Sequence, residues 1–183
     1  MRKIFEEMEE SHLVLVLSEP LTLKKKNIEI IRDVTKDGFH VIVITTNNPY
    51  SILMKDYSKE GIDPGKVFFI DAITKYAGGK EPEKTENCVF INGPADLTSM
   101  GIAVTEVLKK TSSDKVCVLL NTVNSMLIYI TPENLIKFVH FIASKLRLFD
   151  ISGVFLAVEK GIDPSTLIQL QSFIDDVIQD DDE

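Results

Sequence analysis

Six short, wholly apolar runs alternate along this chain with longer segments whose apolar residues have helical spacing. The runs cover residues 13–17, 41–44, 67–70, 88–91, 116–120 and 154–158. Apolar and polar residues do not alternate inside them, which is typical of strands buried on both faces of a sheet. Such strands, alternating with helices, predict an α/β fold of three αβα layers around a mostly parallel sheet with right-handed crossovers.

The segments between these runs predict the helices and one long loop. Helices are expected at residues 23–36, 49–59, 96–110, 132–148 and 165–178. Residues 72–87 combine glycines, a proline and many charges, so we expect a loop there. The whole chain, residues 1–183, is predicted to be a single domain with a short charged segment at 1–11 and an acidic tail at 179–183.

Composition excludes several classes of function. The formal net charge is −8, which argues against a nucleic-acid groove. No apolar run approaches the roughly twenty residues that cross a membrane, and the charged N-terminus has no signal-peptide core, so a cytoplasmic protein without membrane contact is expected. Cys88 and Cys117 lie inside apolar runs and are expected to be buried hydrophobes, and the three histidines lack zinc spacing, so no metal site is predicted.

The first apolar run is followed by a turn and a helix, as in an ATPase phosphate loop. Against the frame G-x-x-x-x-G-K-[ST], Ser18 replaces the first glycine, Leu23 the second, and Lys25 the hydroxyl residue, while Lys24 matches. The glycines let backbone N–H groups turn toward a phosphate, and the hydroxyl holds Mg²⁺. Leu23 is expected to occupy the place of the phosphate, so the sequence predicts a nucleotide-hydrolase scaffold whose chemistry has been removed.

Two carboxylates directly follow predicted strands. Asp71 and Glu159 could form an acid–base pair or hold Mg²⁺. The favoured alternative is that they cap turns or pair with Lys75 and Lys160. No Ser-His-Asp or Cys-His arrangement has suitable context, so no catalytic residue is assigned.

The order of these parts resembles a RecA-type ATPase core, and more narrowly the KaiC-like/GvpD-like group, over residues 11–178. The most specific part is residues 116–129, an apolar strand followed by a short polar stretch, Leu and Tyr, and then the helix at 134–147. Residues 172–178 are similar to the closing helix of that group, which leads into a further strand. In longer members of the group the chain then forms a terminal hairpin. Since this chain ends in acidic residues soon after residue 178, we expect that hairpin to be absent.

The chain departs from the family pattern at each catalytic loop. The Walker B strand of the family ends in an Asp that supports Mg²⁺, and here that position is Asn121. The loop at residues 45–48 has no carboxylate to orient water. The resemblance therefore implies a P-loop-type fold with degenerate Walker motifs. Its nucleotide-site positions are Ser18, Thr22, Lys24, Lys25 and Asn121.

The resemblance also implies a strand order, because Walker A and B elements serve one phosphate. We expect the strand at 116–120 to lie beside the strand at 13–17.

Three functions follow, in decreasing order of preference. The first is a non-catalytic module that binds a protein partner or self-associates, without cofactor or metal. The second is a sensor that binds ATP, another nucleotide or an anion weakly and without turnover, since Lys24 and the helix N-terminus attract negative charge. The third is a divergent enzyme that uses Asp71 and Glu159.

Overall fold

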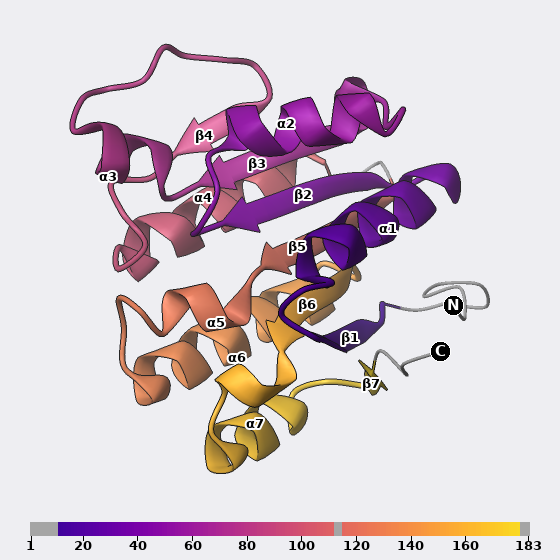
Figure 1. Ribbon diagram of the computed structural model, residues 1–183, viewed down its shortest axis with the longest axis vertical. Coiled ribbons are helices and arrows are strands. Elements are labelled where there is room, and N and C mark those ends of the chain that lie inside the picture. The colour runs from indigo at the N-terminus through magenta and orange to yellow at the C-terminus, as the bar shows by residue number, and fades with distance from the viewer. Residues whose placement is uncertain (1–10, 112–114, 180–183) are drawn as a thin grey trace.

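The computed structural model describes residues 11–111 and 115–179, and these residues contain a seven-stranded sheet in which every pairing is parallel. The strand order is β4-β3-β2-β5-β6-β1-β7 (Figure 1). The strands are β1 (Leu13–Ser18), β2 (His40–Thr45), β3 (Val67–Asp71), β4 (Cys88–Phe90), β5 (Val116–Asn121), β6 (Ser152–Val158) and β7 (Asp176–Gln179). The predicted α/β class is confirmed, and so are all six predicted strands.

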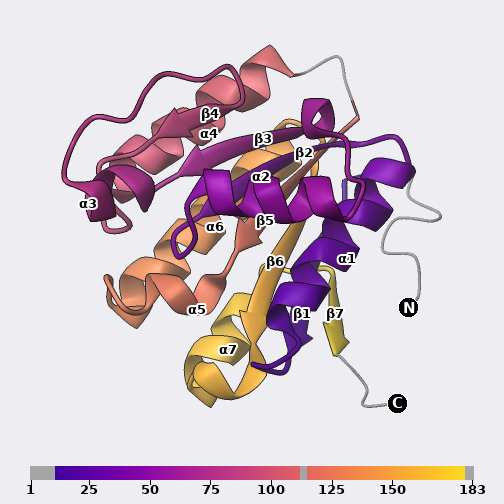
Figure 2. The same cartoon turned by 45° about the horizontal axis from the view of Figure 1, so that its top comes forward.

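Helices cover both faces of the sheet, which gives the expected three layers. They are α1 (Leu23–Lys36), α2 (Tyr50–Lys59), α3 (Thr74–Gly78), α4 (Leu97–Lys110), α5 (Val123–Met126), α6 (Pro132–Leu148) and α7 (Pro164–Gln171). Figure 2 shows α1 and α2 on one face, with α4 and α6 on the other. Because the strands carry apolar side chains toward both faces, each helical layer has its own core.

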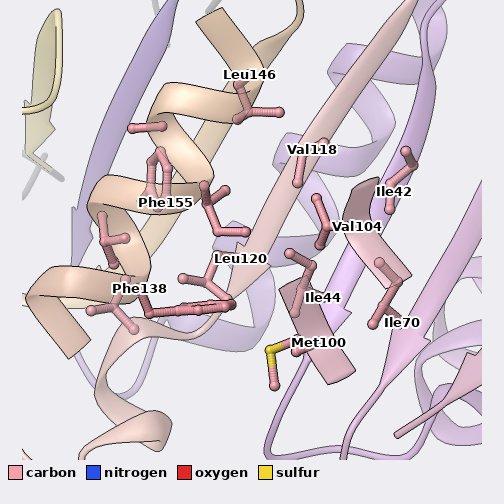
Figure 3. Packing of buried hydrophobic residues seen from close by; sticks show 14 of the residues in the cluster. Ile42, Ile44, Ile70, Met100, Val104, Val118, Leu120, Phe138, Leu146 and Phe155 are labelled. Atoms are coloured by element: carbon pink, nitrogen blue, oxygen red, sulfur yellow. The ribbon is translucent and has the colours of Figure 1, made fainter. Parts of the chain in front are cut away.

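Alternate side chains along each strand belong to different cores, because they point to opposite faces of the sheet. In β1, Leu13, Leu15 and Leu17 pack toward α4 and α6, whereas Val14 and Val16 pack toward α1 and α2. Figure 3 shows the first core, where Phe138 and Leu146 of α6 and Met100 and Val104 of α4 meet strand residues such as Leu120 and Ile44. This two-sided burial explains why the strands read as continuous apolar runs.

The C-terminal part of the chain differs from the prediction. The helix expected at 165–178 ends at Gln171, and Asp176–Gln179 forms β7 beside β1, so a further strand follows the last helix. Local spacing could not reveal this, because the partner strand lies more than 150 residues away, with Val14 opposite Asp176. The segment 1–11, apart from Ser11, and the tail 179–183, apart from Gln179, lie outside the described residues.

Two shorter helices were missed. The expected loop at 72–87 contains α3, and α5 follows β5 directly. Both are only one turn or so long, and helices this short carry too few apolar positions to show a period.

The expected strand adjacency is wrong. β5 pairs with β2 and β6, and β6 separates it from β1. The ends of β1 and β5 are therefore two strand spacings apart, about 10 Å. Loops at the same edge of a parallel sheet can serve one ligand at that separation, so adjacency was too strict a requirement.

Candidate functional site

The candidate site lies at the carboxyl edge of the sheet, where the loops after β1, β2, β3, β5 and β6 emerge (Figure 1). The β1–α1 loop closes on itself there. Buried Ser18 shares a hydroxyl hydrogen bond of 3.1 Å with Thr22, and both the N–H and the hydroxyl of Thr22 donate to the Glu19 carbonyl at 3.2 Å. The Thr22 N–H is thus used inside the loop instead of facing a phosphate.

The lysines that open α1 face carboxylates. Lys24 Nζ lies 2.8 Å from Asp56 Oδ2 on α2, and Lys25 Nζ lies 3.7 Å from Glu29 Oε1 one turn along α1. Lys24 is the one residue retained from the phosphate-loop frame, and its charge is directed toward the neighbouring helix. Its partner could not be read from the sequence, because Asp56 lies on a different helix.

Leu23 does not block the loop in the expected way. Its side chain is partly buried and packs against the core between the sheet and the α1–α2 layer. The expectation that it fills the phosphate position is therefore corrected: Leu23 begins the inward stripe of α1. Leu23 lacks the backbone freedom that a glycine would give the loop, but its side chain does not fill the loop.

Beneath the first turns of α1 lies a small buried polar cluster that sequence reasoning missed. Lys26 is only 9% exposed and Asn27 only 4%. The Tyr57 hydroxyl donates to Asn27 Oδ1 at 2.8 Å, and burial raises the pKa of Tyr57 well above its usual range. Asn27 Nδ2 has no hydrogen-bond partner within the described part of the chain. The available signal was an Asn in helical register with Ile30, Ile31 and Val34, the buried apolar residues of the same helix.

Asn121 ends β5 and is 3% exposed. Its side chain forms no hydrogen bond with another described residue, and its peptide bond to Thr122 is cis. The loop that follows is held by neutral groups: Ser125 Oγ shares a 2.6 Å hydrogen bond with Thr46 Oγ1, and Asn124 bonds to both the N–H and the carbonyl of Val158. These contacts connect the loops after β2, β5 and β6 without any carboxylate.

Asp71 has a structural role. It is fully buried, and it accepts backbone hydrogen bonds of 2.8 Å from Tyr50, Ile73 and Thr74, together with one from the Thr74 hydroxyl. The expected turn-capping role is confirmed. Four donors occupy its oxygens, so little capacity remains to hold Mg²⁺ or to take a proton.

Glu159 is partly exposed and accepts a 3.2 Å hydrogen bond from Gln179 of β7. The suggested lysine pairings are wrong, since Lys75 pairs with Glu81 and Lys160 with Glu19. Three strand spacings, about 14 Å, separate the ends of β3 and β6, so Asp71 and Glu159 do not share a reaction centre.

Other candidate chemistry is limited in the described residues. Within 11–111 and 115–179, no group of three or more His, Cys, Asp and Glu side chains is placed to hold a metal ion. The same ranges contain no helix with the length and apolarity to cross a membrane. Cys88 and Cys117 are unpaired and buried, as expected, and burial raises the pKa of both thiols.

Comparisons with known proteins match this geometry at the level of fold and family. Residues 29–180 match the model of a family of unknown function, DUF7504. No curated protein sequence matches the chain. One similar solved structure is the uncharacterized protein PH0321 from Pyrococcus horikoshii in complex with an unknown peptide, with a TM-score of 0.73, 12% identity, and coverage of 94% of this chain and 78% of that one.

A second similar structure is the KaiC-like protein PH0186 from the same hyperthermophilic archaeon. Its TM-score is 0.64 at 12% identity, with coverage of 93% of this chain and 71% of that one. At this identity the likeness concerns the fold alone, and the fold is RecA/KaiC-like.

Proposed function

This chain belongs to DUF7504, a family of unknown function, and we propose that it is a cytoplasmic, non-catalytic RecA/KaiC-like domain that acts by binding another protein or a second copy of itself. The proposal is supported by the fold and by the residues at the loops where a nucleotide would bind, which depart from the phosphate-loop pattern.

The observation that carries it is the state of the β1–α1 loop. Lys24 pairs with Asp56 at 2.8 Å, and the Thr22 N–H is donated to Glu19 within the loop. A phosphate would have to break both contacts and would find no glycine backbone to replace them. At the end of β5, Asn121 supplies no charge for Mg²⁺.

Two exposed apolar side chains support a protein-binding role for the carboxyl edge of the sheet. Leu21, at the tip of the β1–α1 loop, is 98% exposed, and Ile128, just after α5, is 76% exposed. Single exposed apolar residues are common, but these two stand on loops that emerge at the same edge of the sheet. The solved complex of PH0321 with an unknown peptide adds support from a protein of similar fold.

Steady-state phosphate release with Mg²⁺ and ATP or GTP tests the proposal. We expect no turnover above the protein-free background, and the same result for Lys24→Ala. Turnover that the wild-type chain shows and Lys24→Ala loses would establish a working site and would reject the non-catalytic assignment.

The second candidate is a nucleotide or anion sensor without turnover. It is favoured by the buried polar cluster, where Asn27 Nδ2 lacks a partner in the described residues close to the N-terminus of α1. A thermal-shift series with ATP, ADP and GTP separates the candidates, because a ligand at about 100 times its Kd adds roughly 2.7 kcal/mol. A shift that Asn27→Leu abolishes would move the sensor to first place.

A further inference from the structure

A groove runs between α4 and α6 on the face of the sheet opposite α1. Its volume is about 610 Å³, within the range of ligand-binding clefts. The apolar part of its lining comes from both helices: Leu97, Gly101, Ile102, Phe138 and Phe141. This groove is separate from the carboxyl-edge loops, since all of its lining residues lie on α4 and on residues 134–141 of α6.

Gly101 shapes the groove. Glycine inside a helix costs about 1 kcal/mol relative to alanine, so its place in the middle of α4 requires a compensating contact. A Cβ at this position would lie 3.0 Å from Phe141 Cε1, so the missing side chain lets the Phe141 ring rest directly on α4. Phe141 nevertheless stays 38% exposed, and Ile102 stays 54% exposed. Two large apolar side chains thus remain open to a partner.

The rim of the groove is basic although the protein is acidic. Lys109 and Lys137 line it, and Lys145 Nζ lies 5.6 Å from the centre of the Phe141 ring. Glu106 is the one acidic residue in the lining. Neither Lys109 nor Lys137 forms an ion pair with a described residue, in a chain whose formal net charge is −8. This local excess of positive charge is complementary to an acidic ligand.

We propose that this groove binds an acidic amphipathic helix of a protein partner. From Leu97 to Lys109 the groove extends about 18 Å along α4, the length of three helical turns. Apolar side chains of the bound helix at positions i, i+4 and i+7 contact Ile102, Phe138 and Phe141, while its flanking carboxylates face Lys109 and Lys137. The inference rests on the proposed protein-binding function and adds to it a surface apart from the carboxyl edge, with the chemistry of its partner.

The test uses the full chain and a fluorescein-labelled 14-residue helical peptide with Leu, Phe and Leu at i, i+4 and i+7 and Glu on its flanks. Saturable fluorescence anisotropy is expected, with affinity falling as salt is raised. The double variant Lys109→Glu, Lys137→Glu should bind the Glu-flanked peptide at least 10-fold more weakly than the wild type does. It should bind the matching Lys-flanked peptide instead. Ile102→Ser should also weaken binding at least 10-fold.

The matched control combines Lys55→Glu with Lys59→Glu on α2, where both side chains are exposed on the opposite layer, and its affinity should equal that of the wild type. No saturable binding of the Glu-flanked peptide, equal affinity for both peptides, or no effect of the groove variants would overturn the assignment. These failures would leave the proposed non-catalytic function in place, whereas Lys24-dependent phosphate release would reject that function whatever the groove binds.

Discussion

At the residue scale, partners decide the role of each polar side chain. Lys24 matches the lysine of a phosphate loop, yet Asp56 holds it toward α2. Asp71 ends a parallel strand where a catalytic carboxylate could lie, yet four donors occupy its oxygens. Residue type and position therefore describe what chemistry is available, and the hydrogen-bond partners describe what it is used for.

Asp71→Asn is expected to lower the free energy of unfolding by about 3 kcal/mol. In the variant an NH₂ group replaces one carboxylate oxygen. The backbone N–H groups that now donate to that oxygen would then face another donor and stay buried and unpaired. Urea unfolding measures this as a lower midpoint with an unchanged slope. The control, Glu159→Gln, changes a partly exposed side chain and should stay within about 0.5 kcal/mol. A similar small loss for Asp71→Asn would contradict its structural role.

At the element scale, packing contacts explain both the agreement with the sequence and its failure at the C-terminus. Leu170 is buried in α7, but the chain leaves the helix after Gln171 and runs beside β1 as β7. The Leu13 N–H donates to Asp175 Oδ2 at 2.8 Å, and the Asp175 N–H donates to the Leu13 carbonyl at 2.9 Å, which directs the chain into the ladder. These contacts outweigh a local helical spacing.

Gly153→Ala is expected to destabilise the contact between β6 and α6. A Cβ there would lie 2.5 Å from Leu146 Cδ1 and 3.2 Å from Leu13 Cδ2, and both leucines are fully buried. Such overpacking costs about 1–3 kcal/mol, measurable as a drop in Tm of roughly 2–4 °C per kcal/mol for a chain of this size. Gly78→Ala is the control, because no atom lies within 4 Å of its Cβ position. Equal Tm values for the two variants would show that β6 and α6 have room to adjust.

At the scale of the whole molecule, Asp175 connects segments from both ends of the chain. Arg147, at the end of α6, donates to Asp175 Oδ1 at 2.9 Å, and the start of β1 bonds to its other oxygen. Partial burial opposes ionisation of Asp175, but the hydrogen bonds from Arg147 and Leu13 and the charges of Arg147 and His12 outweigh it and lower the pKa. One carboxylate thus joins β1, α6 and β7.

Asp175→Asn should cost about 2 kcal/mol at neutral pH, the usual contribution of hydrogen bonds to a charged group. A carboxyl whose pKa is lowered by folding stabilises the native state above its unfolded value near 3.9 and loses that contribution as pH falls through the folded value. The stability difference between wild type and variant, from urea titrations at pH 7 to pH 3, should therefore shrink below about pH 4. When both proteins also carry Arg147→Met, the stability difference caused by Asp175→Asn should be smaller at every pH. A stability difference that stays constant with pH would contradict this linkage.

Local sequence patterns account for the three layers of the fold. Wholly apolar runs require burial on both faces, and amphipathic helices between them supply the cover, so strands, main helices and a parallel sheet follow from local patterns. The missing glycines around Ser18 and Leu23 and the neutral Asn121 are likewise visible without coordinates. These features could be predicted because each depends on residues close together in the chain.

Which segments lie next to one another depends on contacts that no local pattern specifies. Each of β1, β2, β3, β5 and β6 is apolar enough to pair with any of the others, so no single run determines that β6 lies between β5 and β1. The same holds for β7, for the Lys24–Asp56 pair, and for the unpaired amide of Asn27. Each depends on contacts between segments distant in sequence, and their free energies exist only once the chain has brought those segments together.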